Sequence, residues 1–266
     1  MPDFDSIRAL IIDGDGVLWR GGAPLPGLCD FFLTLRRRVL PFVVATNNAT
    51  APPQAVQAKL SQFGVEVSLA EILTSAEATA ALLRQRLSAG ARVLAVGEQG
   101  LRMALEQAGF EVVDKADQTQ AVVVALDRGM TYDLLAEASL AIGAGALFVG
   151  TNPDVNFPSE RGLVPGSGAI LAALQVTTGR APLIVGKPEP HLFLEALRRL
   201  GTPAEVTLGL GDRLETDIVG GNRAGLPTAL VLTGVSRRED LDASPVRPDW
   251  VFQDLRAVTQ ALSRDP

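Results

Sequence analysis

The sequence has a single cysteine, Cys29, among its 266 residues. No disulfide can form within the chain, which therefore needs no oxidising compartment. Long apolar runs are also missing: the longest candidate, 138–150, is broken by glycines and falls short of the ~18 residues that span a bilayer. The first residues are acidic where a secretory signal is basic, and the first apolar stretch, 9–12, is far too short for such a signal. These absences predict a soluble, cytoplasmic protein with no membrane partner.

Positive charge is scarce as well. Lys and Arg number 24 against 30 Asp and Glu, which gives a net charge of −6, and the longest basic run is only 36–38. A protein held by contacts to a phosphate backbone needs a basic face, so we expect no nucleic-acid polymer as a partner. Apolar residues make up 47% of a chain long enough to bury roughly three quarters of its unfolded surface, which excludes a coiled coil and a disordered chain.

The sequence does contain a regular alternation of two patterns. Short apolar runs rich in β-branched residues alternate with helical patterns of about 10–15 residues, as in a parallel sheet covered by helices. Pro52-Pro53 opens a helix that Gly64 closes, and the capping-box spacing of 74–77 opens another. The fold class is therefore predicted to be α/β. The expected strands are 8–13, 40–46, 92–96, 121–126, 146–151, 183–185, 206–211 and 228–232.

Two short breaks, 86–91 and 177–182, suggest how the chain divides. Between them lie about ninety residues with their own strand and helix alternation, enough for a small second α/β domain. We therefore predict one domain built from residues 1–88 and 182–266, with residues 89–181 inserted as a second domain.

Two carboxylates follow the first expected strand, in the sequence Asp13-Gly14-Asp15-Gly16. The apolar run before them places both at the C-terminal end of a buried strand, where open α/β sheets bind ligands. Carboxylates this close repel each other, so they favour a bound cation or a shared proton. The same four residues are common in plain turns, so this motif by itself leaves both interpretations open.

Small polar side chains and one lysine follow two further strands. Thr46 and Asn47 end the run 40–46, where a hydroxyl, an amide and free backbone N–H groups suit phosphate oxygens; a helix N-cap is the alternative. Lys187 follows the run 183–185 and is either a charge that neutralises phosphate or a solvated surface group. It is not a P-loop lysine, because Pro188 stands where that motif requires Ser or Thr.

Two more aspartates, Asp212 and Asp217, follow the strand expected at 206–211. The glycines of this segment resemble part of a dinucleotide-binding fingerprint, but Leu214 stands in place of its third glycine. An aspartate at the position of the pyrophosphate would also repel that ligand. A nicotinamide dinucleotide is therefore not expected here.

Four strand ends thus bring together carboxylates, one cation and small hydrogen-bonding groups. The residues concerned are Asp13, Asp15, Thr46, Asn47, Lys187, Asp212 and Asp217. Oxygen ligands, with no second cysteine and only one histidine, describe a site for a hard cation, Mg²⁺ before Zn²⁺. Mg²⁺ beside a lysine and donors suited to phosphate implies phosphoryl chemistry.

In this order the motifs resemble those of haloacid dehalogenase superfamily phosphatases. The likeness is to the NagD-like subfamily, which includes 4-nitrophenyl phosphatases and the phosphatases of phosphoglycolate and pyridoxal phosphate. Segments 122–128, 131–132, 151–154 and 165–168 resemble the inserted cap of that subfamily. The resemblance covers nearly the whole chain and implies a Rossmann-like parallel-sheet core with a smaller α/β cap domain.

The resemblance also implies roles for the four aspartates. Asp13 would be the nucleophile that forms an aspartyl-phosphate, and Asp15 would be the acid for the leaving alkoxide and then the base for water. Asp13, the backbone carbonyl of Asp15 and Asp212 would hold Mg²⁺, and Asp217 would orient that group. The dehalogenases themselves lack the second acid, so Asp15 favours a phosphatase.

The remaining roles concern the substrate. By the same resemblance, Thr46, Asn47 and Lys187 would bind the phosphoryl oxygens, and the cap would close on the substrate and read its leaving group. The cap residues considered for specificity are Asn152, Asp154 and Phe157, for which a turn and a place in the cap core are the alternative.

The main functional hypothesis is therefore a Mg²⁺-dependent hydrolase of a small phosphorylated metabolite. Nucleoside monophosphates, phosphoglycolate, sugar phosphates and 4-nitrophenyl phosphate all present the same phosphoryl end, so the sequence does not choose among them. A regulatory binding protein and a phosphomutase on the same fold are the alternatives. The resemblance also allows a homodimer that pairs through the cap, and the oligomeric state stays open.

Overall fold

In the computed structural model, which describes residues 4–159 and 161–263, strand β1 (Ala9–Ile12) lies inside a six-stranded sheet and is buried along its whole length. It pairs in parallel with β13 on one side and with β4 on the other, so both of its edges are hydrogen-bonded. The strand order is β15-β14-β13-β1-β4-β5. The other strands are β4 (Phe42–Thr46), β5 (Ile72–Thr74), β13 (Thr207–Gly211), β14 (Thr228–Val231) and β15 (Trp250–Phe252).

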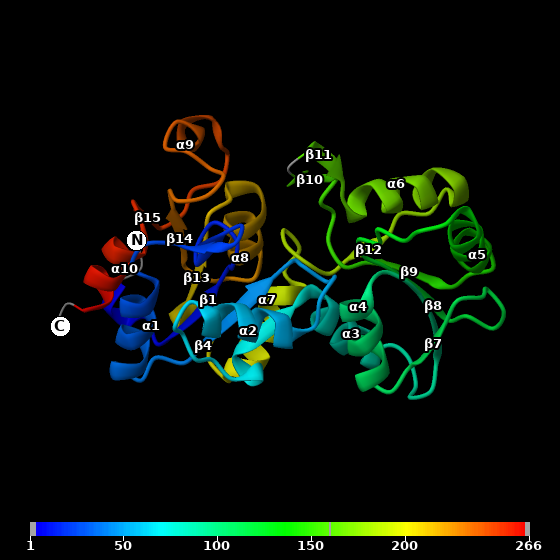
Figure 1. The fold of residues 1–266 in the computed structure, drawn as a ribbon, viewed down its shortest axis with the longest axis horizontal. Coiled ribbons are helices and arrows are strands. Elements are labelled where there is room, and N and C mark those ends of the chain that lie inside the picture. Colours follow the sequence, from blue (N-terminus) through cyan, green and yellow to red (C-terminus); the bar gives the residue numbers. More distant parts are fainter. Residues whose placement is uncertain (1–3, 160, 264–266) are drawn as a thin grey trace. The chain divides into compact units, whose positions relative to one another are not determined.

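Helices connect and cover this sheet (Figure 1). They are α1 (Leu28–Arg37), α2 (Pro53–Gln62), α7 (His191–Leu200), α8 (Val219–Arg223), α9 (Asp240–Ala243) and α10 (Leu255–Leu262). Four shorter turns accompany them, namely η1 (Phe4–Ser6), η2 (Leu69–Glu71), η3 (Ala204–Val206) and η4 (Leu214–Ile218). A small antiparallel hairpin, β2 (Trp19–Arg20) and β3 (Ala23–Pro24), follows the turn after β1.

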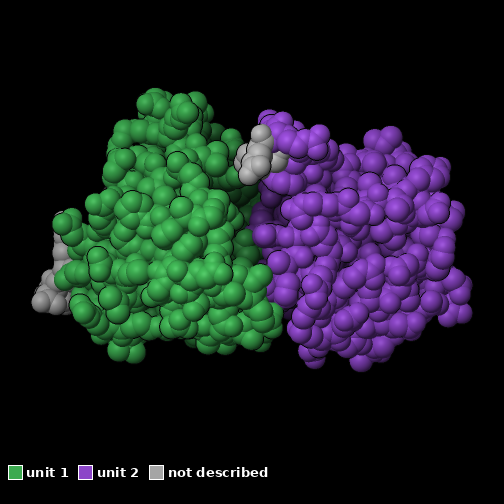
Figure 2. Space-filling view, viewed as in Figure 1, with its two compact units in different colours: residues 1–46, 54–73, 187–266 green, residues 47–53, 74–186 purple. Residues whose placement is uncertain are grey.

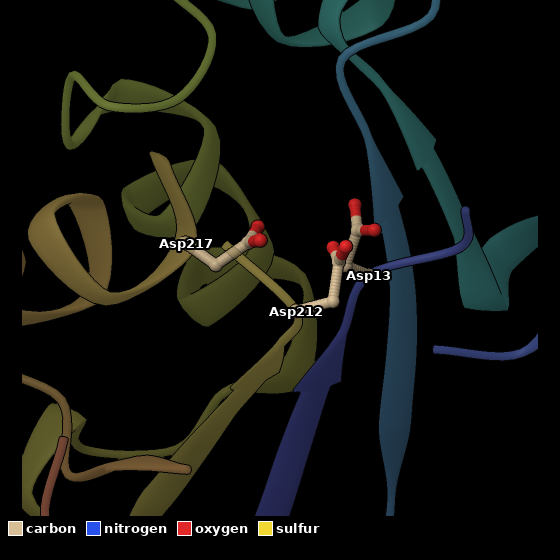
Figure 3. A group of neighbouring side chains, drawn as sticks. All are labelled: Asp13, Asp212 and Asp217. Atoms are coloured by element: carbon tan, nitrogen blue, oxygen red, sulfur yellow. The ribbon is translucent and has the colours of Figure 1, made fainter. Parts of the chain in front are cut away.

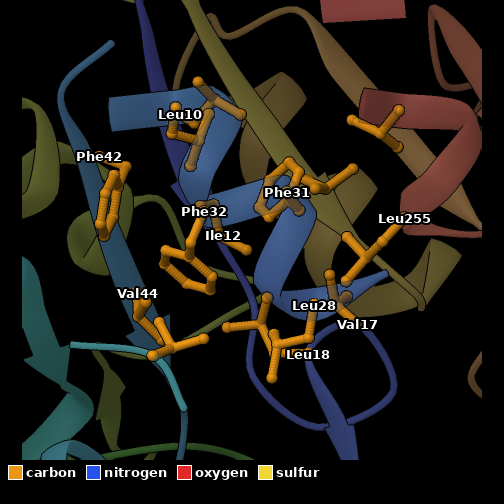
Figure 4. Packing of buried hydrophobic residues seen from close by; sticks show 14 of the residues in the cluster. Leu10, Ile12, Val17, Leu18, Leu28, Phe31, Phe32, Phe42, Val44 and Leu255 are labelled. Carbon is orange, nitrogen blue, oxygen red and sulfur yellow. The ribbon is translucent and has the colours of Figure 1, made fainter. Parts of the chain in front are cut away.

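The core of this sheet domain is built from alternating strand residues and one face of α1 (Figure 4). Leu10 and Ile12 of β1 meet Phe31 and Phe32 of α1, which belong to a helical stripe of buried residues at 28, 31, 32 and 35. Each such buried side chain stabilises the fold by about 1.5–3 kcal/mol relative to exposure. This packing fixes β1, and with it the residues that follow its C-terminal end.

The second sheet is also parallel and has the order β12-β9-β8-β6-β7. Its strands are β6 (Arg92–Val96), β7 (Glu111–Val113), β8 (Ala121–Val124), β9 (Leu147–Gly150) and β12 (Leu183–Ile184). Its helices are α3 (Ser75–Arg84), α4 (Gln99–Gln107), α5 (Tyr132–Gly143) and α6 (Ser167–Thr178), and an antiparallel pair, β10 (Asn156–Ser159) and β11 (Gly162–Pro165), precedes α6. A separate apolar cluster from β6, β8, α5 and α6 forms its core.

Two compact units correspond to these sheets (Figure 2). The first unit contains the chain up to residue 46, residues 54–73 and the chain from residue 187 onward. The second contains residues 47–53 and 74–186, so its boundaries differ from the predicted 88/89 and 181/182. Residues 74–88, which include helix α3, account for most of the difference, because α3 packs against α4. In the part of the chain that the structure describes, no helix is long and apolar enough to cross a membrane.

The predicted strands and helix starts are found close to their expected places. Each of the eight predicted runs contains a strand, and α2 begins at Pro53. The capping box at 74–77 is formed in both directions: Glu77 N donates to Thr74 Oγ1 at 3.2 Å, and Thr74 N donates to the Glu77 carboxylate at 3.0 Å. The helix it opens begins at Ser75, directly after the N-cap Thr74. Strands β5, β7 and β15 are only three residues long, and the sequence pattern missed them together with the two antiparallel pairs, β2–β3 and β10–β11.

Candidate active site

Two neighbouring strands of the first sheet each end in an aspartate. Asp13 N donates to the carbonyl of Leu210 at 2.9 Å, which continues the parallel pairing of β1 and β13 by one residue. Asp13 and Asp212 therefore emerge side by side at the carboxyl edge of the sheet (Figure 3). Asp212 is 1% exposed, and the Asp13 side chain is 12% exposed. The ladder of two buried strands thus brings two carboxylates together in a place poor in water.

Asp217 comes from η4, a single turn of π-helix directly after β13. Its backbone N–H donates to Arg213 O at 3.0 Å, and its Oδ2 accepts from Arg213 N at 3.1 Å, so the side chain caps its own turn. π-Helical turns of this kind occur often at functional sites. The local geometry points the Asp217 carboxylate toward Asp13 and Asp212 (Figure 3).

Lys187 is the cation among these carboxylates, and it is only 3% exposed. Its ammonium group donates to Asp13 Oδ1, to Asp217 Oδ1 at 2.7 Å and to the main-chain carbonyl of Ala45 at 3.1 Å. The third contact lies on β4, immediately before Thr46. Lys187 therefore donates hydrogen bonds to residues at the ends of β1 and β4 and in the η4 turn. Because it is buried, the alternative of a solvated surface lysine is wrong.

The loop after β14 holds the Asp212 carboxylate. Val235 N donates to Asp212 Oδ2 at 2.7 Å, and Ser236 N donates to the Asp212 carbonyl at 3.1 Å. A Cβ atom at Gly234 would lie 1.8 Å from Asp212 Oδ2, so only glycine lets this loop approach so closely. The sequence analysis did not predict these contacts of Val235 and Ser236. The segment 233–236, Thr-Gly-Val-Ser, does follow an apolar run with small polar residues, as the other predicted strand ends do.

The charges in this cluster do not balance. Burial raises the pKa of Asp13 well above its ordinary value, with Lys187 opposing and the charges of Asp217 and Asp212 adding to the rise. Burial, together with the charge of Asp217, raises the pKa of Asp212 to about 6. Burial alone would lower the pKa of Lys187, but Asp13 and Asp217 outweigh it and raise that pKa, so Lys187 stays charged. Three carboxyl groups around one ammonium therefore resist full ionisation in this buried place, and a bound cation would offset their charge.

The same cluster has the donor atoms for a metal ion. Asp13, Asp212 and Asp217 each offer a carboxylate oxygen, and these atoms lie within 4.8 Å of one another. Both oxygens of Asp217 already accept hydrogen bonds, from Lys187 and Arg213. Among the described residues, no hydrogen bond ends on the second oxygens of Asp13 and Asp212. An oxygen-only set with unmatched negative charge fits a hard divalent cation such as Mg²⁺.

Asp15 lies apart from the three buried carboxylates. It is exposed, in a turn where the amides of Leu18 and Trp19 both donate to Gly14 O, at 2.9 and 3.2 Å. Its Oδ1 accepts a hydrogen bond from Trp19 Nε1 at 2.8 Å. The segment that begins at Asp13 is therefore a turn, as one reading of the motif had it, and this turn presents one buried and one exposed carboxylate. Trp19 is a contact that the sequence motif did not reveal.

Thr46 and Asn47 fall on either side of the boundary between the two units. Thr46 is the last residue of β4 and is buried. The carbonyl of Asn47 accepts from Ser75 Oγ at 2.6 Å and from Asn152 Nδ2 at 2.9 Å, both in the second unit. Of the two, Thr46 is therefore the residue placed with the aspartate cluster, by its position next to the Ala45 carbonyl.

The three residues considered for specificity lie in the second unit, around the end of β9. Asn152 is buried, and its amide is engaged at both ends: Nδ2 donates to Asn47, and Oδ1 accepts from Asp154 N at 3.1 Å and from Ser167 Oγ. These bonds favour the alternative of a structural turn for Asn152. Asp154 and Phe157 are half-buried. Their part in specificity stays a prediction.

Comparison with known proteins gives a consistent result. Residues 10–111 match the haloacid dehalogenase-like hydrolase family, and residues 184–258 match a second family model described as HAD-hydrolase-like. An acid sugar phosphatase from Staphylococcus aureus (strain USA300) is 38% identical over 257 residues, covering 97% of this chain and 98% of the relative.

Solved structures agree in both sequence and fold. NagD from Escherichia coli K-12 is 35% identical with a TM-score of 0.88, over 97% of this chain and 98% of NagD. A glycerol phosphate phosphatase from Mycobacterium tuberculosis, crystallised in complex with magnesium, is 40% identical with a TM-score of 0.89, over 98% of this chain and 78% of that one. The predicted fold, a parallel-sheet core with an inserted α/β unit of NagD type, is confirmed.

Proposed function

This chain belongs to the haloacid dehalogenase-like hydrolase family, and we propose that it is a Mg²⁺-dependent phosphatase of small phosphomonoesters that forms an aspartyl-phosphate on Asp13. One observation carries this proposal: a buried lysine bonds Asp13 while a second buried aspartate, Asp212, keeps an oxygen without a hydrogen-bond donor. Such a site pairs a nucleophile with a fixed positive charge and leaves room for a cation. This is what transfer of a phosphoryl dianion requires.

Asp13 and Asp212 are the residues that would hold Mg²⁺, together with the backbone carbonyl of Asp15. When bound, the ion would offset the charge of the phosphoryl group as a carboxylate approaches it. Asp217 would not need to bind the ion directly, since its two oxygens hold Lys187 and the η4 turn. The magnesium complex of the Mycobacterium tuberculosis relative supports the choice of ion.

The first half of the reaction joins the phosphoryl group to the protein. A carboxylate oxygen of Asp13 forms a bond to phosphorus while the bond from phosphorus to the leaving oxygen breaks. Asp15, in its protonated form, gives its proton to that leaving oxygen, so an alcohol departs and Asp15 becomes a carboxylate. Lys187, Thr46 and Asn47 would bind the phosphoryl oxygens during this step.

The second half releases phosphate. Asp15 takes a proton from water as the water oxygen bonds phosphorus, and the bond between Asp13 and phosphorus breaks. Inorganic phosphate leaves, Asp13 is a carboxylate again, and Asp15 is protonated for the next turnover. The exposure of Asp15 supports this double role, because its proton can exchange with solvent in either state.

The substrate we propose is a small phosphorylated metabolite. Relatives named for acid sugar phosphates and for glycerol phosphate support this class, and nucleoside monophosphates and phosphoglycolate present the same phosphoryl end. Residues 89–181 would act as the cap that excludes water and reads the leaving group, with Asn152, Asp154 and Phe157 as candidates for that reading. Pairing of two chains through this cap is a further prediction, which sedimentation velocity would check.

The direct test is hydrolysis of 4-nitrophenyl phosphate with and without metal. We expect turnover with Mg²⁺, none with EDTA, and recovery when Mg²⁺ is restored. Asp13→Asn should lower kcat by more than about a thousandfold, because the amide cannot act as the nucleophile. Asp30→Asn, an exposed position on α1, is the matched control and should keep wild-type activity.

Three results would contradict the proposal. They are turnover that survives EDTA, an active Asp13→Asn variant, and a wild type that binds Mg²⁺ but is inert toward a broad set of phosphomonoesters. Transfer of phosphate to a second sugar hydroxyl, in place of its release, would indicate a phosphomutase. A kcat/KM screen over metabolite phosphates at saturating Mg²⁺ would then identify the substrate.

A further inference from the structure

Asp15 is exposed, yet its carboxylate is held by a buried side chain. Trp19 is 2% exposed, and its Nε1–H donates to Asp15 Oδ1 at 2.8 Å. The two residues are also linked through the backbone: Asp15 and Trp19 form an isolated β-bridge, and Gly16 N donates to Trp19 O at 2.7 Å. The indole therefore reaches the carboxylate from a position that the main chain already fixes.

The ring of Trp19 has little freedom to move. A Cβ atom at Gly14 would lie 2.5 Å from Trp19 Cζ2, so the ring rests directly on the backbone between Asp13 and Asp15. The ring also belongs to the apolar core of the first unit, which includes the buried residues of α1. The ammonium group of Lys59, on α2, lies over the ring at 4.4 Å from its centroid. A donor held in this way needs no rearrangement to orient the carboxylate.

The hydrogen bond also decides which oxygen of Asp15 carries a proton. An indole N–H only donates, so the oxygen it faces must accept. In the neutral acid the carbonyl oxygen is the stronger acceptor, so this bond favours the form with Oδ1 as the carbonyl oxygen and the proton on Oδ2. The bond restrains the rotation of the carboxyl group and leaves Oδ2 as the oxygen that does not face the indole.

From this geometry we propose that Trp19 is a positioning residue for the leaving-group proton: it holds Oδ1 of Asp15 so that Oδ2 delivers the proton. The proposal rests on the proposed function, in which Asp15 is the general acid. Lys59 supports the same contact, because a positive charge on the face of the indole draws electron density from the ring and strengthens its N–H as a donor. Neither Trp19 nor Lys59 touches the reacting atoms in this scheme.

The chemistry of the leaving group provides the test. An alkoxide, as released from glycerol phosphate, is strongly basic and needs a proton as it departs, whereas 4-nitrophenolate is a stabilised anion that leaves without one. The parameter kcat/KM covers only the steps through departure of the leaving group, so it isolates the acid role of Asp15 from its later role as a base. A defect in proton delivery therefore lowers kcat/KM for the alkyl phosphate far more than for the aryl phosphate.

The experiment compares Trp19→Phe with Trp250→Phe in the full chain with Mg²⁺. Trp250 is the only other tryptophan of the sequence, and it packs against the ring of Phe4 at 5.0 Å. We expect Trp19→Phe to lower the ratio of kcat/KM values, glycerol phosphate over 4-nitrophenyl phosphate, by about tenfold or more. Trp250→Phe should leave this ratio at the wild-type value. Lys59→Met should lower the ratio in the same direction by about twofold, since it weakens the donor without removing it.

Because Trp19 is buried, the phenylalanine variant could lose stability, and melting curves by circular dichroism would reveal this. Benzothienylalanine at position 19 keeps the shape of the indole and replaces its N–H with sulfur, so it removes the donor alone and should lower the ratio as Trp19→Phe does. Equal losses on both substrates, or an unchanged ratio with benzothienylalanine, would refute the positioning role while the phosphatase itself stands. A wild type inert toward both substrates would refute the proposed function, and the positioning role with it.

Discussion

The ends of two parallel strands, β13 in the first unit and β9 in the second, carry polar networks of opposite kinds. After β13, Asp212 lies with Asp13 and Asp217, both of which bond Lys187, and one oxygen of Asp212 has no donor among the described residues. After β9, the neutral amide of Asn152 is hydrogen-bonded at both ends by Asn47, Asp154 and Ser167. The two networks therefore differ in charge. The first contains carboxylates whose charge a bound cation would offset, and the second is a neutral amide that bonds only to neighbouring protein groups.

The energetic side of this comparison follows from the pKa values. A rise in the pKa of Asp212 from 3.8 to about 6 disfavours its charged form by roughly 3 kcal/mol. The fold tolerates this cost at the first network, and a bound cation would remove it. No comparable charge is buried in the network around Asn152.

The largest effect is expected from Lys187→Met. This change leaves Asp13 and Asp217 buried without their cation, and breaking a buried ion pair in this way costs about 3–5 kcal/mol. Urea unfolding at neutral pH in EDTA should show that loss, and activity toward 4-nitrophenyl phosphate should vanish. Lys115→Met is the matched control, because Lys115 pairs with Glu137 at 3.1 Å while being 71% exposed. Its cost should stay below about 1 kcal/mol. Equal losses of unfolding free energy in the two variants would show that the buried ion pairs of Lys187 stabilise the fold no more than the exposed pair of Lys115 does.

A smaller effect is expected from Asn152→Ala in the second network. The change removes the hydrogen bonds of the Asn152 side chain, whereas the Asn47 carbonyl keeps its bond from Ser75 and the Ser167 hydroxyl keeps its bond to the main-chain carbonyl of residue 152. Lost hydrogen bonds whose partners stay satisfied cost about 0.5–1.5 kcal/mol each. Asn156→Ala, at an exposed position on β10, is the control and should change the free energy of unfolding by less than about 0.5 kcal/mol. A stable Asn152→Ala variant with an altered order of substrate preference would instead favour the predicted specificity role of Asn152.

The contrast between the two networks could be anticipated only in part from the sequence. Apolar runs followed by Asp13, Lys187 or Asp212 predict strands with polar ends, and the structure has those strands at β1, β12 and β13. The carboxyl ends of parallel strands share one edge, so β1 and β13 bring Asp13 and Asp212 together once they are neighbours. The sequence pattern and the strand order together were therefore sufficient to predict that Asp13 and Asp212 lie close to each other.

Other features depend on packing that no local pattern contains. The bond from Trp19 to Asp15 requires the ring to rest on Gly14, and the clamp on Asp212 comes from Val235, more than twenty positions away. The extent of the second unit likewise follows from α3 packing against α4 and not from a Gly-rich break in the sequence. Such contacts are set by tertiary structure, which is why sequence reasoning missed them.

The smallest predicted effect concerns the buried carboxylate of Glu195. Two cations surround this one carboxylate, whereas in the first network three carboxyl groups surround one cation. The side chain of Glu195 on α7 is 8% exposed. Its Oε1 lies 2.7 Å from Nη2 of Arg198 and 3.3 Å from Nε of Arg199. Burial alone would raise the pKa of Glu195, but the hydrogen bonds and charges of the two arginines outweigh it and lower that pKa. A carboxylate with a lowered pKa in the folded state stabilises the protein above its unfolded pKa, and this contribution is lost as pH falls.

Glu195→Gln should therefore reduce the free energy of unfolding by about 1 kcal/mol at pH 7, and the gap to wild type should close as the pH is lowered through the ordinary range of glutamate. Urea titrations of both proteins from pH 7 downward measure this gap directly. A gap that widens toward low pH would mean that the arginines do not stabilise the charged form, and that Glu195 resembles Asp212 after all.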